Sequence, residues 1–420
     1  MCIPQSVRSP FPYGGVVLKR YFIVPVNISN NMKNVKVYAE YIAIWVLRTV
    51  LNIFNLFPIR QNRIMFYSFN GKQYSCNPRC ISDTLLNDDD LEIYWAFKDP
   101  DKFSGGLPEK IRTVRFRSLR YYFLAKTSRV IVCNVQQYGE LARRKGQDII
   151  QTWHASNGYK KVGNYTGFTR KLNLMGHRDY SYVLSGAESM TERRVRGTMK
   201  FFGPVLPGTP RMDVLVNRKD DWIIDKVKKE LGCPAQTQLL LYAPTWRGSR
   251  ESGKYPLSYQ ELYATLKERF PGEWMIAVRY HPNVKDRVIS SLPYVVDATD
   301  YPDMQELLYT ADALISDYSS CIWDYSFTYR PCFLFCYDLK EYYAEKSFDL
   351  PIEEWGFPIC VTMEELDDAI RSYDADVNRQ AMNKHHEAMG SLEDGHATER
   401  VRTLIRSLTG HAKKVEHEKV

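Results

Sequence analysis

The sequence predicts an α/β protein in which two doubly wound halves face each other across a central cleft. From residue 62 onward, short apolar runs alternate with stretches of helix length, which is the pattern of parallel α/β architecture. A chain of 420 residues is also too long for one ordinary hydrophobic core. Three prolines and a glycine crowd positions 204–210, and a charged run follows at 218–221. This change in composition marks the boundary between the two halves.

Each half contains six apolar runs of strand length. Those of the first half are Arg63–Tyr67, Leu91–Phe97, Val114–Phe116, Val130–Cys133, Ile149–Trp153 and Tyr182–Leu184. Those of the second half are Leu239–Ala243, Met275–Tyr280, Tyr294–Val296, Ala313–Ser316, Cys332–Cys336 and Pro358–Val361. Open parallel sheets bind ligands beyond the carboxyl ends of their strands. The polar residues that directly follow these runs are therefore the candidates for a functional site.

The net charge of +8 is concentrated at the N-terminus. Residues 1–60 contain seven Lys or Arg and one Glu, so the remainder of the chain is nearly balanced. A nucleic-acid-binding protein usually spreads basic side chains over a folded face, and this distribution argues against nucleic acid as a partner. The nine cysteines have no zinc-site spacing, and their odd number indicates a reducing cytosol.

Residues 35–57 predict a helix that lies at a membrane surface. Arg48, Asn52 and Asn55 recur at helical spacing and form one polar stripe, while apolar residues cover most of the remaining surface. Basic flanks and belt-type aromatics such as Trp45 are typical of interfacial helices in anionic headgroups. A helix packed on the protein's own core is the alternative. No eighteen uninterrupted apolar residues occur, which argues against a membrane span.

A second basic stretch, 110–129, carries seven Lys or Arg around an aromatic run and contains no acid. It is either a solvated basic face above core aromatics or a contact for acidic lipid or polymer. The sequence leaves both interpretations open.

In the first half, His154 ends an apolar run and opens a basic loop. A histidine in that place can take a proton from an attacking hydroxyl, while the neighbouring Lys160 and Lys161 meet negative charge. Ser156 lies in the same loop, and with Lys160 and Lys161 it is a candidate contact for the acceptor, the molecule that carries the attacking hydroxyl. The alternative is a packed histidine beside solvated lysines.

In the second half, His281 ends another apolar run, two residues after Arg279. An imidazolium at that position could neutralise a diphosphate or protonate its leaving oxygen, and a structural His–Pro turn is the alternative. Thr245 and Arg247 follow the first run of this half. Arg247 suits bidentate recognition of phosphate, although it could also be an ordinary surface arginine.

The densest polar turn follows the run at 313–316. Ser319 and Ser320 are expected to open a helix whose free N–H groups and two hydroxyls form an anion site. Asp317 is expected to hydrogen-bond the turn or cap the helix. Asp324 lies one turn further on, where its carboxylate could bind two ribose hydroxyls. Plain strand–turn–helix packing is the alternative.

Six motifs in this order resemble those of the CDP-glycerol glycerophosphotransferases that build teichoic acids and capsules. They are QTWHASNGYKKVG, GTPRMDVL, LYAPTWRG, RYHPN, SDYSSCIWDY and RPCFLFCYDLKEYYAEKSFDL. The resemblance runs from about residue 62 to 365. It implies a GT-B fold, a CDP-glycerol or related CDP-polyol donor, and peripheral attachment to the cytoplasmic face of the cell membrane, where lipid-linked acceptors lie.

The resemblance also implies roles for particular residues. His154 and His281 match the two essential histidines of the family, and Ser319 and Ser320 match its donor-phosphate serines. The spacing from Asp324 to the next proline resembles that of the ribose-binding acid in the GT-B enzyme that makes lipid II. The chain departs from the family's usual motifs at 155–156, at Met212 and at 346–347, where Lys346 replaces an arginine and is a candidate donor contact.

These observations lead to four predicted segments and one predicted reaction. The segments are a membrane-associating arm at 1–60, a Rossmann-like acceptor domain at 61–215, a Rossmann-like CDP-donor domain at 216–385, and a helix with a polar tail at 386–420. The chain is expected to transfer a polyol-phosphate, in the simplest case glycerol-phosphate, to a hydroxyl of a membrane-linked acceptor and to release CMP. No Walker or GxGxxG motif or paired-carboxylate metal motif occurs, so no metal or cofactor is expected.

Two alternatives remain: a GT-B sugar-nucleotide glycosyltransferase, and a non-catalytic, membrane-attached polymer-binding subunit. The choice between glycerol and ribitol, between primase and polymerase, and the oligomeric state stay open.

Overall fold

The computed structural model of the chain describes residues 28–410 apart from 104, 137–138, 162–166, 248–254, 282–283, 285–286 and 288, with side chains from residue 37 onward except at 168. The first 27 residues of the predicted arm and the last ten of the predicted tail lie outside the described residues. So does the proline that follows His281.

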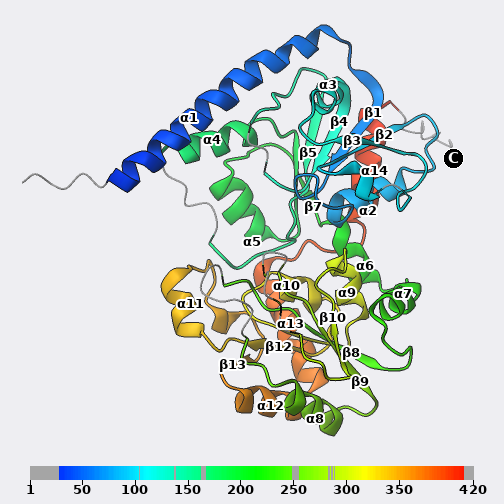
Figure 1. Cartoon of the computed structure of the whole chain (residues 1–420), viewed down its shortest axis with the longest axis vertical. Helices are drawn as coiled ribbons and strands as arrows, with labels where there is room; N and C mark the ends of the chain where they lie inside the picture. The colour runs from blue at the N-terminus through cyan, green and yellow to red at the C-terminus, as the bar shows by residue number, and fades with distance from the viewer. Residues whose placement is uncertain are drawn as a thin grey trace, which may run out of the picture.

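Two parallel sheets form two lobes, one above the other in Figure 1. The first sheet has the order β3-β2-β1-β4-β5-β6-β7. Its strands are β1 Arg60–Tyr67, β2 Glu92–Phe97, β3 Ile111–Arg115, β4 Ser128–Cys133, β5 Asp148–Gln151, β6 Tyr182–Ser185 and β7 Val205–Pro207. The second sheet has the order β10-β9-β8-β11-β12-β13. Its strands are β8 Gln238–Tyr242, β9 Trp274–Val278, β10 Val295–Asp297, β11 Ala313–Ser316, β12 Cys332–Phe335 and β13 Ile359–Cys360.

Both orders step outward from a central strand in two directions, as in doubly wound folds, and the predicted α/β class is confirmed. Each of the twelve predicted runs overlaps a strand. The strand that sequence reasoning missed is β7, which lies among the prolines read as a boundary. Its Pro207 is tolerated because β7 is an edge strand of the sheet.

Helices cover both faces of each sheet (Figure 1). Those of the first lobe and the connection are α2 Cys76–Thr84, α3 Leu119–Thr127, α4 Gly167–His177, α5 Glu188–Met190 and α6 Asp213–Asn217. Those of the second lobe are α7 Trp222–Leu231, α8 Tyr259–Arg269, α9 Met304–Thr310, α10 Cys321–Ser326, α11 Leu339–Glu345 and α12 Met363–Arg371. Because the strands are buried on both faces, they read as continuous apolar runs, and all five residues of β9 are buried.

The end of the chain crosses back to the first lobe. Helix α13 (Ala375–Met389) packs in the second lobe, whereas α14 (Ala397–Leu408) lies against α2. Val401 and Ile405 join a core cluster with strand residues of the first sheet. The boundary expected at residue 385 falls inside α13. The lobes also meet through Arg79 of α2, which pairs with Asp303 and Glu306 at α9 at 3.2 and 3.1 Å.

The described part of the N-terminal arm is a helix, α1 (Ile28–Val50), continued by a short 3₁₀ turn (Leu51–Leu56). Its polar stripe is partly tied to the protein. Arg48 pairs with Asp179 of the first lobe at 2.6 and 2.9 Å, and Asn52 accepts a hydrogen bond from Lys126 at 3.1 Å. Asn52 and Asn55 are nevertheless exposed, so only the Arg48 end of the stripe is turned toward the first lobe.

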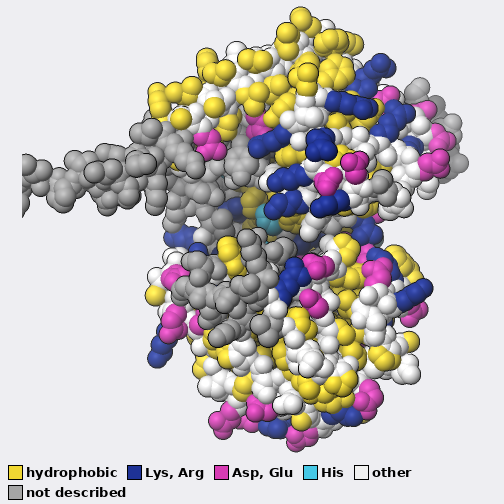
Figure 2. All heavy atoms as spheres, viewed as in Figure 1, with side chains coloured by type: hydrophobic (Ala, Val, Ile, Leu, Met, Phe, Trp, Pro, Cys, Tyr) yellow, Lys and Arg dark blue, Asp and Glu magenta, His cyan; other side chains and the backbone are white. Residues whose placement is uncertain are grey.

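The outer face of this arm is apolar. Trp45 is 56% exposed, Ile53 61% and Leu56 83%, and hydrophobic side chains line the upper edge of the first lobe in Figure 2. By length and composition, Val37–Leu56 is apolar enough to cross a membrane. The criterion of eighteen uninterrupted apolar residues did not reveal this, because Arg48 and the asparagines interrupt the run.

Candidate active site

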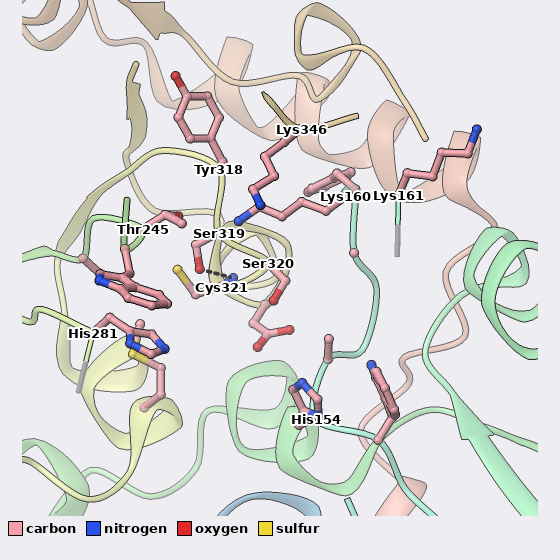
Figure 3. Close-up of a pocket in the computed structure, with 18 of the residues that line it drawn as sticks. His154, Lys160, Lys161, Thr245, His281, Tyr318, Ser319, Ser320, Cys321 and Lys346 are labelled. Atoms are coloured by element: carbon pink, nitrogen blue, oxygen red, sulfur yellow. Dashed lines mark hydrogen bonds between the residues drawn. The ribbon is translucent and has the colours of Figure 1, made fainter. Parts of the chain in front are cut away.

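A cavity of about 790 Å³ is lined by residues of both lobes. It lies where the prediction placed it, beyond the carboxyl ends of the strands. His154 follows β5, Thr245 follows β8, His281 follows β9 and Ser319 follows β11. Figure 3 shows these side chains around the cavity. Ten of the predicted site residues line it: His154, Lys160, Lys161, Thr245, Arg279, His281, Ser319, Ser320, Asp324 and Lys346.

The ring of His154 is held in one tautomer. Its Nδ1 lies 2.9 Å from the backbone oxygen of Asn134, and since a carbonyl oxygen only accepts, Nδ1 carries the proton. The lone pair of the neutral ring is then on Nε2. Burial, helped by the charges of Arg211 and Arg194, lowers the pKa of His154 to about 4. The imidazole is therefore neutral at pH 7 and able to accept a proton.

Two aromatic residues with unusual backbone conformations flank His154. Trp153 stacks on the imidazole with ring centres 4.6 Å apart, and Phe69 lies at 5.7 Å. Both have positive φ angles, 52° and 47°, which are costly for bulky side chains. The amide of Asn77 fixes the strained loop by donating to the backbone oxygens of Thr152 and Trp153 at 3.0 and 2.9 Å. Strain of this kind concentrates at functional sites, and no motif of the sequence predicts it.

Opposite His154, four polar side chains of the second-lobe wall gather around the start of α10. Ser319 Oγ accepts a hydrogen bond from the Cys321 N–H at 3.3 Å, and Ser320 immediately precedes the helix. In Figure 3, Lys160 and Lys346 both point toward Ser319, while Lys161 points away. Two ammonium groups and two hydroxyls are suited to an anion. Because α10 has only six residues, the lysines contribute more positive charge than its helix dipole.

The placement of Lys160 corrects the prediction that it lies on the acceptor side. The loop from residue 158 to 161 leaves the first lobe and pairs with 347–349 of the second. The Lys161 N–H donates to the Ser347 oxygen at 2.9 Å, and the Asp349 N–H donates to the Tyr159 oxygen at 2.7 Å. Burial lowers the pKa of Lys160 to about 8, and the charge of Lys346 acts in the same direction. Lys160 therefore lies on the second-lobe wall, beside Lys346.

Arg247 does not line the cavity, so the predicted direct phosphate contact is wrong for this conformation. Its guanidinium donates to Asp338 at 2.7 and 3.0 Å, to the Thr245 oxygen at 2.6 Å, and lies 2.8 Å from Asp317. Burial opposes the charge of Arg247, but the two carboxylates outweigh it and raise its pKa. Asp317 accepts from the Tyr318 N–H of its own turn at 2.5 Å, as expected, and from the Thr245 N–H of the neighbouring loop at 3.0 Å. Arg247 is thus a support for the loop that carries Thr245.

Ser156 is also not at the cavity surface. Its hydroxyl donates to Glu393 at 2.5 Å and accepts from the indole of Trp323 at 3.0 Å. Glu393 further accepts from the N–H and hydroxyl of Thr209 at 3.0 and 2.7 Å, and burial raises its pKa to about 7. These contacts tie the His154 loop to the interlobe connection and to the segment after α13. Sequence reasoning missed Glu393 because no apolar run precedes it.

Asp324 lines the cavity, although its side chain is only 1% exposed. Arg211 of the interlobe connection pairs with it, and the amide of Gln305 lies at 3.4 Å. Burial raises the pKa of Asp324, and Arg211 opposes this. Its Oδ1 has no hydrogen-bond partner among the described residues. The predicted ribose contact stays a prediction, for which Oδ1 is the available atom.

His281 stacks on Trp246 with ring centres 5.6 Å apart. Burial, together with the charges of Lys72 and Lys160, lowers its pKa, so the imidazolium expected from the sequence is disfavoured before an anion binds. Arg279 donates to the backbone oxygens of Ala298 and Tyr301 at 3.1 and 2.6 Å, which fixes its guanidinium at the cavity. Among the described residues, no group of three or more His, Cys, Asp or Glu could hold a metal ion.

Two facing doubly wound sheets with a cationic cavity between them define the GT-B class. The chain belongs to the CDP-Glycerol:Poly(glycerophosphate) glycerophosphotransferase family, whose model matches residues 49–407. In structure it is similar to the wall teichoic acid polymerase TagF, with a TM-score of 0.77 and 24% identity over 91% of this chain and 98% of that one. A histidine variant of TagF soaked with CDPG matches with a TM-score of 0.76 and 25% identity, over 90% of this chain and 98% of that one.

Curated relatives carry related names. The teichoic acid poly(glycerol phosphate) polymerase of Staphylococcus epidermidis is 28% identical over 372 residues, which are 83% of this chain and 51% of the relative. The chain thus spans about half the length of that polymerase. The teichoic acid glycerol-phosphate transferase of Staphylococcus aureus is 27% identical over 359 residues, which are 81% of this chain and 92% of the relative.

Proposed function

We propose that the chain transfers a polyol-phosphate from a CDP-polyol to a hydroxyl of a membrane-linked acceptor and releases CMP. Glycerol-phosphate is the simplest group, in keeping with the family and with the names of the relatives. One observation carries the proposal above all. A neutral histidine with Nδ1 protonated, His154, shares a cavity with an anion-binding wall built from Lys160, Lys346, Ser319 and Ser320.

The proposed step is an attack of the acceptor oxygen on the phosphorus that bears the polyol. A new phosphorus–oxygen bond forms to the acceptor, and the bond from that phosphorus to the bridging oxygen breaks. CMP leaves with the bonding electron pair, and His154 Nε2 takes the acceptor's proton. Negative charge grows on the departing phosphate, so fixed cations and hydrogen-bond donors give most of the stabilisation.

The second lobe is proposed to hold the donor. Lys160 and Lys346 would neutralise the diphosphate, with the Ser319 and Ser320 hydroxyls as hydrogen-bond donors. His281 would donate to the departing phosphate, and the approach of that anion would raise its lowered pKa. Thr245 and Arg279 line the same wall, and the Thr245 hydroxyl has no partner among the described residues. Asp324 Oδ1 is proposed to accept from the ribose.

The rival functions predict other chemistry on the same fold. A sugar-nucleotide glycosyltransferase would break the sugar–oxygen bond and release a nucleoside diphosphate. The family match favours phosphoryl transfer over sugar transfer. A polymer-binding subunit without activity would have no use for the strained aromatic residues that flank His154, or for the hydrogen bond to Asn134 that holds its ring in one tautomer.

We also propose that the chain sits peripherally on the cytoplasmic face of the membrane. The exposed apolar face of α1 and the following turn would enter the headgroup region, as in interfacial helices. The ion pair between Arg48 and Asp179 holds the helix against the first lobe. This contact favours a helix that lies beside the lobe at the membrane surface, in preference to a helix that crosses the membrane.

Separate measurements of turnover and donor binding test the proposed roles. His154→Ala should lower CMP release about 10²–10⁴-fold, the usual contribution of a general base, and leave CDP-glycerol affinity by calorimetry nearly unchanged. His281→Ala should weaken donor binding and turnover together, because His281 shares the anion-binding lobe. His396→Ala is the matched control, since His396 is exposed and does not line the cavity. If His154→Ala loses donor binding while His281→Ala keeps it, the roles assigned to the two histidines must be reversed.

A further inference from the structure

One loop of the first lobe reaches across the cavity to the second lobe. This segment, residues 154–161, is called the crossing loop below. It begins after β5 with the base His154, and near its end it carries Lys160, a proposed donor contact. At Lys160 its backbone forms an antiparallel bridge with Phe348 of the second lobe. The first lobe thus supplies a cation to the opposite wall of the cavity, and the loop needs an anchor there.

Tyr159 is the residue of the crossing loop that enters the core of the second lobe. Its side chain is only 2% exposed and belongs to the core cluster that contains Leu239 of β8 and Trp355. The Tyr159 ring stacks on Trp355, with ring centres 4.1 Å apart and an angle of 20° between the planes. Stacking of this kind adds to the free energy that burial of the ring already provides. A first-lobe loop is therefore packed into the second lobe by an aromatic side chain.

The hydroxyl of Tyr159 adds a directional contact. It lies 2.7 Å from Nε2 of His385 in α13. The His385 ring also donates to the backbone of Glu354, and burial lowers the pKa of the histidine to about 4. The neutral ring therefore carries its proton on Nδ1, and Nε2 accepts the hydrogen bond from Tyr159. Stacking and this hydrogen bond together fix the position of the tyrosine ring.

The wall that Lys160 reaches does not attract a further cation by itself. Burial lowers the pKa of Lys160 to about 8. Asp317 and Cys321 oppose this shift, whereas the charges of Arg247 and Lys346 add to it. Asp317 already pairs with Arg247 at 2.8 Å. Before a donor binds, the Lys160 ammonium would be more stable in water, so packing elsewhere in the crossing loop must hold it at the wall.

We propose that Tyr159 is a positioning residue, which anchors the crossing loop in the second lobe and thereby holds Lys160 at the anion-binding wall. Neighbouring side chains of an extended segment point to opposite faces, so a tyrosine fixed in the core directs the next side chain away from it. Because this packing forms on folding, the lysine is in place before the donor arrives, and less ordering is lost on binding. The inference rests on the proposed function for the role of Lys160 in donor binding.

Acetylation of lysine side chains tests the placement of Lys160 without any donor. Acetic anhydride reacts with the neutral amine, so labelling over a series of pH values, read by mass spectrometry, reports the pKa of each lysine. In the wild type, Lys160 should reach half of its maximal reactivity near pH 8. In Tyr159→Ala the ammonium becomes solvated, and this midpoint should move up toward about 10.4, the ordinary value for lysine. Lys161 is the internal control, because it is exposed and its profile should be the same in both proteins.

Calorimetry with CDP-glycerol tests whether Tyr159 acts through Lys160. Lys160→Gln should weaken donor binding about ten- to hundredfold, the range for hydrogen bonds to charged groups. Tyr159→Ala should approach this loss, and the double variant should bind no more weakly than Lys160→Gln alone, because both changes remove the same contact. The proposal is wrong if Tyr159→Ala leaves donor binding unchanged, or if its loss remains in full when Lys160 is already replaced.

Two conservative variants control for a general effect on folding. Tyr159→Phe keeps the stack on Trp355 and loses only the hydroxyl, so its effects should have the same direction as those of Tyr159→Ala and a smaller size. Tyr325→Phe is the matched control, because Tyr325 is also buried in the second lobe, donates to the Ala311 oxygen at 3.1 Å and does not line the cavity. It should leave the labelling profile and donor binding unchanged. If Tyr159→Ala does not fold, an unchanged Lys160 midpoint together with unchanged affinity in Tyr159→Phe would overturn the proposal.

The anchoring role and the proposed function can fail separately. If the wild type binds no CDP-glycerol, or releases no CMP from any CDP-polyol, while the Lys160 midpoint still moves in Tyr159→Ala, the proposed function fails and the anchoring role stands. If CMP release depends on Lys160 while the midpoint is the same in folded Tyr159→Ala and wild type, the anchoring role fails and the proposed function stands.

Discussion

Acidification of the reaction tests the environment of His154 quantitatively. A histidine in water has a pKa of about 6.5, whereas burial lowers the pKa of His154 to about 4. Between pH 7.5 and 5, a base with the ordinary pKa would lose its unprotonated form about 30-fold. His154 would lose only about a tenth of it over the same interval. The diphosphate of the donor does not titrate in this range, and protonation of His281, whose pKa burial also lowers, would favour its proposed role. We therefore expect that kcat/KM does not fall between pH 7.5 and 5.

The assay is the initial rate of CMP release at donor concentrations below KM, at constant ionic strength from pH 5 to 8. Phe69→Asn is the informative perturbation, because asparagine tolerates the positive φ of this position and replaces the aromatic cover by a polar group. In that variant, the pH below which kcat/KM falls (the acid limb of the profile) should move up toward 6.5. An acid limb near 6.5 in the wild type, or one that Phe69→Asn leaves in place, would refute the reasoning.

Three further predictions concern the donor wall, its support and the arm. The donor KM should rise above about pH 8 as Lys160, whose pKa is lowered to about 8 by burial, loses its charge, and Lys160→Arg should remove this rise in a pH series. Arg247→Met should lower the unfolding free energy by about 3–5 kcal/mol, because it leaves buried carboxylates unpaired, and urea denaturation that finds no loss would contradict the assigned support role. Ile53→Glu with Leu56→Glu should abolish flotation with anionic vesicles while CDP-glycerol affinity persists. Unchanged flotation would place the membrane contact elsewhere, with 110–129 the next candidate.

The fold could be predicted because both sheets are parallel and covered on both faces. Strands such as β9 are then wholly apolar, and the polar residues that follow them gather at one edge. The same rule brought His154, His281 and Ser319 into one cavity although more than 150 residues separate the first from the last. It could not reveal β7, whose three residues include a proline.

Other features depended on contacts between distant segments. The side to which Lys160 belongs is set by backbone pairing of its loop with 347–349. The burial of Arg247 depends on Asp338, which lies 91 positions away. Helical spacing located the polar stripe of α1 but could not show that its Arg48 end faces Asp179 and leaves the apolar side outward. The basic stretch 110–129 is mixed, since Arg112 is exposed while Arg129 pairs with Asp148.

The central claim is that the bond broken lies between the two phosphates of a CDP-polyol. The most direct test is product analysis with CDP-glycerol labelled in the glycerol and in the phosphate that bears it, in the presence of a glycerol-phosphate oligomer. The account predicts CMP and an acceptor that gains both labels in equal amounts, with no such product from His154→Ala. Release of CDP, or transfer of glycerol without its phosphate, would contradict it.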